Sequence, residues 1–172
     1  MISQGDVISY LDMCREEGVN LQRGMNFHLR GRHSVILMSI RPGAPYADRI
    51  EEEGKILIYE GHDIPAQKNG PHPKAVDQPE RNPGGGLTQN GLFYKAAMQF
   101  KRGMGEPELV KVYEKIRSGI WVYNGIFRLI DAWREDINNR KVFKFKLELV
   151  DEIHSDSKKL ISDLDHHRII PT

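Results

Sequence analysis

The stretch Val142-Phe-Lys-Phe-Lys-Leu-Glu-Leu149 indicates the fold class of this chain. Apolar and charged residues alternate through it, which is typical of a β-strand with one buried and one solvated face, because successive side chains of a strand point to opposite sides. Further apolar, β-rich runs precede it at 109–113, 120–123 and 125–133. The pairs Asn124-Gly125 and Asn138-Asn139 have the composition of tight turns. The second half of the chain is therefore predicted to hold three or four consecutive antiparallel strands.

Two further strands and two helices are predicted before this region. A β-rich apolar run at 33–40 and a second run at 55–59 look like a pair of strands. Apolar residues at helical spacing predict a helix over 3–17, with Cys14 on its buried side. The same kind of pattern predicts a helix over 88–103.

Together these elements predict an α+β domain in which a strongly curved, mostly antiparallel, β-barrel-like sheet is flanked by two or three helices. The length of 172 residues and the apolar fraction of 39% suit one domain with a substantial core. We expect residues 1–150 to form this domain, with the barrel at 27–150, and residues 151–172 to form a C-terminal helix and a linker. The segment 65–86 is rich in proline and glycine and is predicted to be a long loop.

The formal net charge of +1 hides an uneven layout of basic and acidic residues. Segment 23–49 carries a net charge of +4, and segments 95–117 and 128–146 carry +3 each. Segments 50–63 and 148–165 carry −4 each. A positive face with acidic flanks would bind a polyanion. The alternative interpretation is a solvated surface of mixed charge.

Several classes of protein and site are disfavoured by what the sequence lacks. Its apolar stretches fall far short of the roughly 20 residues that cross a bilayer. Its start lacks the pattern of a secretory signal, so we expect a cytoplasmic protein without a membrane partner. The single cysteine excludes an intramolecular disulfide, the seven histidines lack the spacing of a zinc site, and no nucleotide-binding or hydrolase motif occurs. We therefore expect no metal, no cofactor and no catalytic residue in this chain.

The most informative polar stretch is Pro42-Gly-Ala-Pro-Tyr46-Ala-Asp48-Arg49, followed by Tyr59-Glu60-Gly61. Two aromatic rings and a carboxylate beside a strand turn are the groups needed to hold an extruded pyrimidine. Aromatic faces replace the lost base stacking, and a carboxylate accepts a hydrogen bond from the amino group of cytosine. The alternative interpretation is that Tyr46 and Tyr59 are ordinary half-buried strand aromatics and that Asp48 is a turn residue.

Several motifs occur in the order found in a known family, namely Tyr46-x-Asp48, residues 54–61, Asp77-Gln78, Thr88-Gln89-Asn90, residues 123–133 and residues 142–147. In this order, over roughly residues 23–150, the chain resembles the SRA (YDG) family of modified-cytosine readers. It looks closer still to the N-terminal SRA-like domain of bacterial modification-dependent restriction endonucleases, in which that domain precedes an HNH nuclease. Their pattern is echoed at 21–26, 44–48, 58–63 and 113–121. The resemblance implies a twisted β-barrel that grips DNA and flips 5-methylcytosine or 5-hydroxymethylcytosine into a pocket.

The resemblance also implies roles for the residues that match the family's pocket. Tyr46 and Tyr59 would sandwich the flipped base, and Asp48 would accept a hydrogen bond from the cytosine amino group. The backbone of Glu60 and Gly61 would line the pocket. Glu60 stands where the eukaryotic readers usually have threonine, and an extra carboxylate there could admit a hydroxymethyl group or point away from the pocket.

Double-stranded DNA is the expected partner. The resemblance implies that Asp77 and Gln78 support or approach the DNA, and we expect phosphate contacts from some of a set of basic residues: Arg23, Arg30, Arg32, Arg49, Lys101, Arg102 and Arg117. The loop at 65–86 is a further candidate for contact with DNA. The final residues, 168–172, resemble the linker that precedes the HNH domain. We therefore expect a recognition module that does not cleave DNA itself. A divalent metal would belong to the nuclease domain, and the full-length protein could be a homodimer.

Two other functions remain open from the sequence. Barrels of the PUA-like and ASCH-like folds bind RNA or modified nucleotides, and they share the expected sheet and basic face. A hydrolase that holds a divalent metal with the acidic strip Glu51–Glu53 is a third class.

Overall fold

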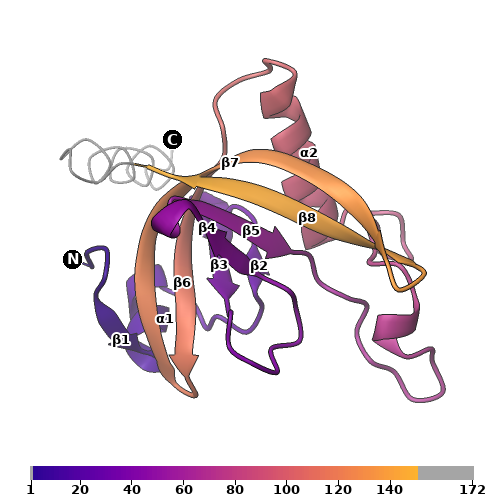
Figure 1. Cartoon of the computed structure of the whole chain (residues 1–172), viewed down its shortest axis with the longest axis horizontal. Coiled ribbons are helices and arrows are strands. Elements are labelled where there is room, and N and C mark those ends of the chain that lie inside the picture. The colour runs from indigo at the N-terminus through magenta and orange to yellow at the C-terminus, as the bar shows by residue number, and fades with distance from the viewer. Residues whose placement is uncertain (1, 151–172) are drawn as a thin grey trace.

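A computed structural model describes residues 2–150, which form one curved sheet with two α-helices (Figure 1). The strands are β1 (Val7–Ser9), β2 (Met25–Asn26), β3 (Ser34–Met38), β4 (Arg49–Glu51), β5 (Ile56–Glu60), β6 (Leu109–Arg117), β7 (Ile120–Ile137) and β8 (Arg140–Leu149). The helices are α1 (Tyr10–Glu17) and α2 (Gln89–Lys101), and short 3-10 turns occupy Leu29–Gly31, Glu52–Gly54 and Pro73–Ala75.

The sheet is mixed, with the strand order β2-β3-β6-β7-β8-β5-β4, and β1 pairs with β7. β3 runs parallel to β6, and every other neighbouring pair among the described strands is antiparallel. The sheet is not closed, because β2 and β4 are its two edges. The predicted α+β class and the strongly curved, mostly antiparallel sheet are confirmed, although the sheet stays open where a barrel would close.

Strand β7 is the longest element, with 18 residues, and it pairs with β1, β6 and β8. Its ladders contain three irregularities, two against β6 and one against β8. Such bulges bend a strand and increase its twist. Figure 1 shows the result, with β7 and β8 arching over the other strands.

The predicted turn at Asn124-Gly125 is wrong. Both residues lie inside β7, where Val112 pairs with Gly125 and Tyr113 pairs with Tyr123, so that Asn124 is the extra residue of a bulge. Gly125 adopts a φ of 106°, which glycine tolerates without steric cost. The second predicted turn, at 138–139, is confirmed, because both asparagines there have positive φ values and join β7 to β8.

The first helix is shorter than predicted. Residues 7–9 form β1 rather than the first helical turn, and the helix is capped by Ser9, whose hydroxyl accepts from the Asp12 N–H at 3.1 Å. The predicted apolar face fails at Val7 and Leu11, which are 70% and 65% exposed. Cys14 is buried as predicted.

The strands at 33–40 and 55–59 do not pair with each other, contrary to the prediction. β3 lies between β2 and the distant β6, and β5 lies between β4 and β8. Both strands are central and nearly fully buried, so their apolar pattern carries no information about which neighbour each one takes. The predicted C-terminal helix and linker, residues 151–172, lie outside the described residues.

Helix α2 packs against the concave side of the sheet through the apolar face that its sequence pattern predicts. Thr88 caps it by accepting from the Gly91 N–H at 3.2 Å. Phe93 and Ala97 are fully buried in the main core, together with Phe143 and Phe145 of β8. The helix N-terminus is thereby fixed beside the end of β5, where the candidate site lies.

A buried polar cluster fixes α1 to the sheet. The Glu17 carboxylate lies 2.7 Å from Lys111 Nζ and 2.8 Å from His33 Nε2, and it accepts a hydrogen bond from the Tyr113 hydroxyl. Burial raises the pKa of Glu17, but the hydrogen bond from His33 and the charge of Lys111 outweigh that effect and lower it to about 2. The carboxylate is therefore the anchor for three polar side chains, two on β6 and one on the residue before β3.

Replacing Glu17 with glutamine should reduce the free energy of unfolding by about 3–5 kcal/mol at pH 7, because Lys111 would remain buried without its partner. Urea denaturation measures this loss, and Glu16→Gln on the exposed side of α1 should change stability by less than about 0.5 kcal/mol. The stability that Glu17 contributes should be present above about pH 4.5 and should be lost as the pH falls toward 2. Equal free energies of unfolding for Glu17→Gln and Glu16→Gln would show that the buried cluster does not stabilise the fold.

Candidate functional site

A cavity of about 590 Å³ lies beyond the end of β5, a size typical of small-molecule sites. Its walls come from five segments: residues 22–25, the loop before β4, the end of β5, the chain that follows β5, and the start of α2. Its lining residues are Gln22, Arg23, Gly24, Met25, Tyr46, Tyr59, His62, Asp63, Ile64, Pro65, Asn82, Leu87, Thr88 and Gln89. The structure thus brings Tyr46 and Tyr59, the two aromatics singled out in the sequence, to one cavity.

Tyr59 is held rigidly by the core. It is 4% exposed, and its hydroxyl donates to the Leu37 carbonyl at 3.4 Å. Gly24 permits this placement, because a Cβ at that position would collide with the Tyr59 hydroxyl. Burial and the neighbouring groups Asp48, Tyr46 and Glu60 raise the pKa of Tyr59 well above its ordinary value. The side chain is therefore a neutral, fixed wall of the cavity.

Tyr46 is held by contacts between two loops. Its hydroxyl accepts from the Asp63 N–H at 3.3 Å, and Lys74 Nζ lies 4.4 Å from the centre of its ring. Lys74 also donates to the Pro45 carbonyl at 2.5 Å and pairs with the Asp63 carboxylate at 2.7 Å. Although burial opposes it, the ammonium of Lys74 and the guanidinium of Arg140 lower the pKa of Asp63. This ion cluster orients the Tyr46 ring.

Asp48 joins the loop before β4 to two strands. One carboxylate oxygen accepts from the Glu60 N–H at 2.9 Å, and the other accepts from the Ser39 N–H at 3.2 Å. Burial raises the pKa of Asp48 to about 6, an effect that these two N–H groups partly offset. Each oxygen of a carboxylate offers two acceptor directions, so each keeps one for a further donor. Asp48 lies next to the two tyrosines in this arrangement but is not itself part of the cavity wall.

Glu60 and Gly61 also lie outside the cavity wall. The buried Glu60 carboxylate lies 3.2 Å from Lys144 Nζ, directly across the ladder on β8. It projects from the sheet face opposite to Tyr59, because consecutive residues of a strand alternate. A Cβ at Gly61 would collide with Asn90 and crowd Gln78. Both positions therefore serve packing, and the structure gives no support to contact between Glu60 and a hydroxymethyl group.

Gln78 and Asp77 have internal partners, and the burial of Gln78 argues against its predicted contact with DNA, whereas contact between the exposed Asp77 and DNA stays a prediction. Gln78 is 4% exposed; its amide donates to the Gly61 carbonyl at 2.7 Å and accepts from the Phe143 N–H at 2.8 Å. Asp77 is exposed but accepts from the Lys141 N–H at 2.8 Å. The two residues fasten the long loop to the start of β8.

Asn90 is a site residue whose role the sequence did not reveal. Its side chain accepts from the His62 N–H and donates to the His62 carbonyl, both at 2.9 Å. It also donates to the Pro79 carbonyl at 3.1 Å. Asn90 thus joins α2 to both ends of the long loop, and a fully buried amide of this kind is recognised only from its partners in the fold.

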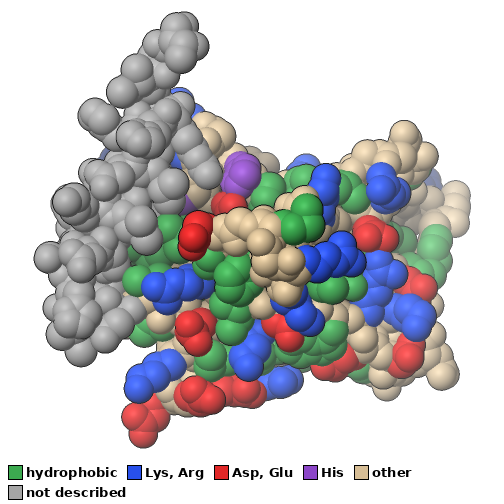
Figure 2. Space-filling view, turned by 90° about the horizontal axis from the view of Figure 1, so that it is seen from above, with side chains coloured by type: hydrophobic (Ala, Val, Ile, Leu, Met, Phe, Trp, Pro, Cys, Tyr) green, Lys and Arg blue, Asp and Glu red, His purple; other side chains and the backbone are tan. Residues whose placement is uncertain are grey.

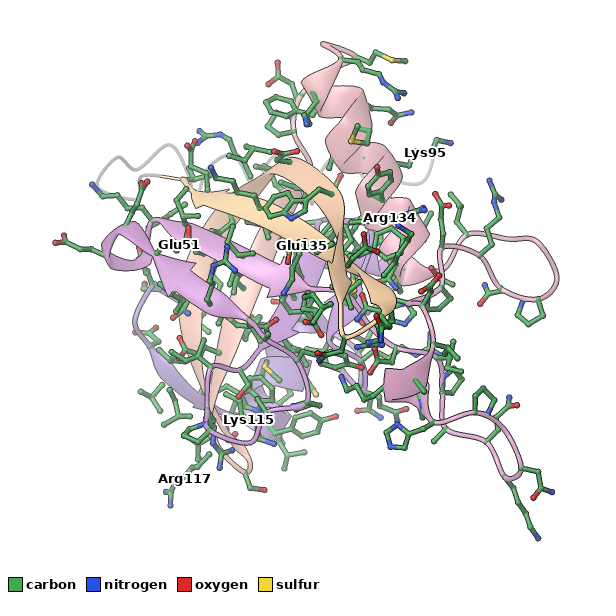
Figure 3. The ribbon with its side chains drawn as sticks, turned by 45° about the vertical axis from the view of Figure 1, so that its right-hand side comes forward. Glu51, Lys95, Lys115, Arg117, Arg134 and Glu135 are labelled. Atoms are coloured by element: carbon green, nitrogen blue, oxygen red, sulfur yellow. The ribbon has the colours of Figure 1, made fainter. Side chains whose placement is uncertain are left out.

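The predicted DNA-contacting bases do not gather on one face. Arg30 and Arg32 donate to carbonyls at the end of α1, at 2.9 and 3.0 Å. Figure 3 places Arg117 at the end of the molecule opposite to α2. Figure 2 shows basic and acidic side chains interspersed on the face that it displays.

Three other predicted DNA-contacting bases have different surroundings. Arg49 pairs with Glu51 at 3.0 Å, and Lys101 pairs with Asp131 at 2.8 Å. Arg23 lines the cavity, so it is the predicted cation nearest to the site. Most of these cations therefore lie on a surface of mixed charge, as the alternative interpretation of the sequence has it. Arg23 is the exception, because it lies at the cavity.

Within residues 2–150, no group of three His, Cys, Asp or Glu side chains has the arrangement of a metal site. The acidic strip Glu51–Glu53 is an exposed turn between β4 and β5, in which Glu52 and Glu53 have positive φ values. No helix among the described residues is long and apolar enough to cross a membrane.

Solved structures with a similar fold include complexes of SRA domains with modified DNA. The SUVH5 SRA complex with hemimethylated CG DNA is 22% identical with a TM-score of 0.59, over 87% of this chain and 90% of that chain. This chain has the SRA fold. The SUVH5 SRA complex with fully hydroxymethylated CG DNA matches with the same identity, TM-score and coverage. KRYPTONITE in complex with mCHH DNA, a histone H3 peptide and SAH is 15% identical with a TM-score of 0.57, and the match covers 32% of that longer chain. No family model matches the chain, and no curated protein sequence matches it.

Substituting Gly24 with alanine should destabilise this SRA fold by about 1–3 kcal/mol, because the new methyl group would displace the rigid Tyr59 ring. Gly86→Ala is the matched control, since nothing lies within 4 Å of a Cβ there, and it should change stability by less than about 0.5 kcal/mol. Thermal and urea unfolding measure both changes. Equal stability of the two variants would show that Tyr59 is not fixed against Gly24.

Proposed function

We propose that this chain binds double-stranded DNA that contains 5-methylcytosine or 5-hydroxymethylcytosine and holds the flipped base in the cavity between Tyr46 and Tyr59. The observation that carries the proposal is that two tyrosines from separate segments line one cavity beside a half-buried carboxylate. The fold supports it, because the solved relatives are complexes of SRA domains with methylated and hydroxymethylated DNA.

The chemistry of the site suits a pyrimidine that has left the stack. Extrusion of a base costs a few kcal/mol of stacking and pairing, and an aromatic platform returns about 1–3 kcal/mol per base. Tyr59 is immobile before binding, and Tyr46 is held in place by Asp63 and Lys74, so little ordering of the rings is needed. An open acceptor direction on Asp48 would receive the cytosine amino group.

The partner of this module is a second part of the proposal. The order of the motifs at 21–26, 44–48 and 113–121 supports a place in a modification-dependent restriction endonuclease, whose HNH domain would cut the DNA. In that arrangement the SRA fold contributes recognition alone.

The purified chain should bind modified duplex without cleaving it in magnesium or manganese, and cleavage would overturn the assignment. Preference for structured RNA over modified duplex in a competition assay would favour the nucleotide or RNA-binding alternative.

Removing the Tyr46 ring should weaken binding to a duplex with one 5-methylcytosine by about 5- to 150-fold, the equivalent of 1–3 kcal/mol of stacking. Tyr46→Ala tests this, with titrations against otherwise identical duplexes carrying cytosine, 5-methylcytosine or 5-hydroxymethylcytosine at fixed salt. Binding to the unmodified duplex should hardly change, because that weaker affinity comes from phosphate contacts.

Tyr46→Phe is the matched control, since it keeps the ring and removes only the hydroxyl that accepts from Asp63 N–H. It should retain most of the preference for modified DNA. If alanine and phenylalanine have the same effect, or if alanine weakens all three duplexes equally, the ring is not a stacking platform.

The preference for modified DNA should fall as the pH drops from 7.5 to 5. The pKa of Asp48 is about 6, so the carboxylate is ionised above this value and gains a proton below it. A protonated carboxyl group has one acceptor direction fewer for the base. The affinity ratio of modified to unmodified duplex reports this loss, because effects of pH on phosphate contacts act on both duplexes alike. In Asp48→Asn the ratio should be low at every pH, and a pH-dependent ratio in that variant would assign the titration to another group.

A further inference from the structure

A second hollow, of about 370 Å³, lies along the outer side of α2. Its lining residues are Glu80, Arg81, Leu87, Gly91, Tyr94, Lys95, Met98, Gln99, Arg102 and Met104. Half of them form one stripe of α2 at helical spacing, and the other half come from the segment before the helix and the turn after it. We call this hollow the α2 groove.

The charges of the α2 groove are mostly unneutralised and basic. Its single acid, Glu80, is paired with Arg134 at 2.7 Å. Arg81 donates to the Gly85 carbonyl at 2.7 Å and keeps its charge. The exposed side chains of Lys95 and Arg102 make no hydrogen bond or ion pair with any described residue. Because Arg134 neutralises Glu80, the cations Arg81, Lys95 and Arg102 leave three positive charges along the groove. In a protein with a net charge of +1, such a local concentration of positive charge favours an anionic partner.

The α2 groove adjoins the cavity lined by Tyr46 and Tyr59, which we call the base cavity. Leu87 lines both hollows, and the first residues of α2 wall the cavity while later residues wall the groove. Lys95 lies on α2, and Arg102 is the residue that follows the helix and caps it. The two are seven residues apart, a distance of about 10.5 Å at the rise of an α-helix. One DNA strand rises about 3.4 Å per phosphate, so the two cations span about three nucleotides. Figure 3 shows Lys95 projecting from α2 away from the sheet.

We propose that the α2 groove holds the sugar-phosphate backbone next to the flipped nucleotide, with Lys95 and Arg102 contacting phosphates. The apolar floor made by Leu87, Met98 and Met104 suits the sugar edge of a strand. This inference rests on the proposed function, since it assigns the path of DNA beside the base cavity. The groove contributes affinity for any sequence and does not read the modification.

The test is the double variant Lys95→Gln/Arg102→Gln, measured on modified and unmodified duplexes over a series of salt concentrations. Each lost phosphate contact reduces the slope of log K against log salt by about 0.9, so the double variant should lose about 1.8. Its affinity at low salt should fall by the same factor for both duplexes. The affinity ratio between the duplexes should stay at the wild-type value.

The matched control is Lys55→Gln/Lys115→Gln, which removes the same charge away from the groove. Lys55 lies in the turn before β5, and Figure 3 places Lys115 far from Lys95. The control should keep the wild-type salt slope. An unchanged slope in the groove variant, or an equal loss in the control, would overturn the groove assignment. Failure of the proposed function would give a different result, because the wild-type protein would then bind the modified and unmodified duplexes equally.

Discussion

The length of β7 is the constraint on which the rest of the structure depends. Its 18 residues pair with β6, with β8 and with β1, so it joins the two halves of the sheet. A straight ladder of that length would leave the sheet flat, and the bulges at Asn124 and near Leu129 bend it instead. The curvature lets α2 pack into the concave side and brings the N-terminus of α2 beside the end of β5. The base cavity lies where these two elements meet the long loop.

Buried polar side chains, more than apolar contacts, determine the shape of the cavity. Asp48 ties the Tyr46 loop to β5, while Gln78 and Asn90 tie the long loop to β8 and α2. Each of these side chains satisfies main-chain groups that a loop would otherwise leave unpaired, and among the described residues no buried side-chain polar atom lacks a partner. The tyrosines therefore line a preformed cavity, and under the proposed function the DNA would change shape far more than the protein.

Local signals in the sequence predicted local structure well. The Thr88 cap, the turn at 138–139 and the alternation in β8 depend only on neighbouring residues, and the structure confirms all three. The pairing of β3 with β6 and the bulge at Asn124 depend on strands distant in sequence, which no local pattern encodes. The candidate site was predicted to a similar extent. The sequence pattern correctly grouped Tyr46 with Tyr59. It could not show that Gln78 faces inward or that Glu60 pairs with Lys144, because both contacts depend on β8. Charge counts along the chain assigned a net charge of +3 to segment 95–117, which contains Lys95 and Arg102, but they could not show that these two cations line one groove with Arg81.

Base extrusion is the central claim, and fluorescence of 2-aminopurine placed next to the modified cytosine tests it most directly. This base is quenched by stacking, so removal of its neighbour from the duplex increases its emission. The account predicts a rise in fluorescence on saturation with the wild-type chain for duplexes with 5-methylcytosine or 5-hydroxymethylcytosine, and little change for the duplex with cytosine. Tight, modification-dependent binding without any rise in emission would contradict it, because the modified base would then be read inside the stacked duplex.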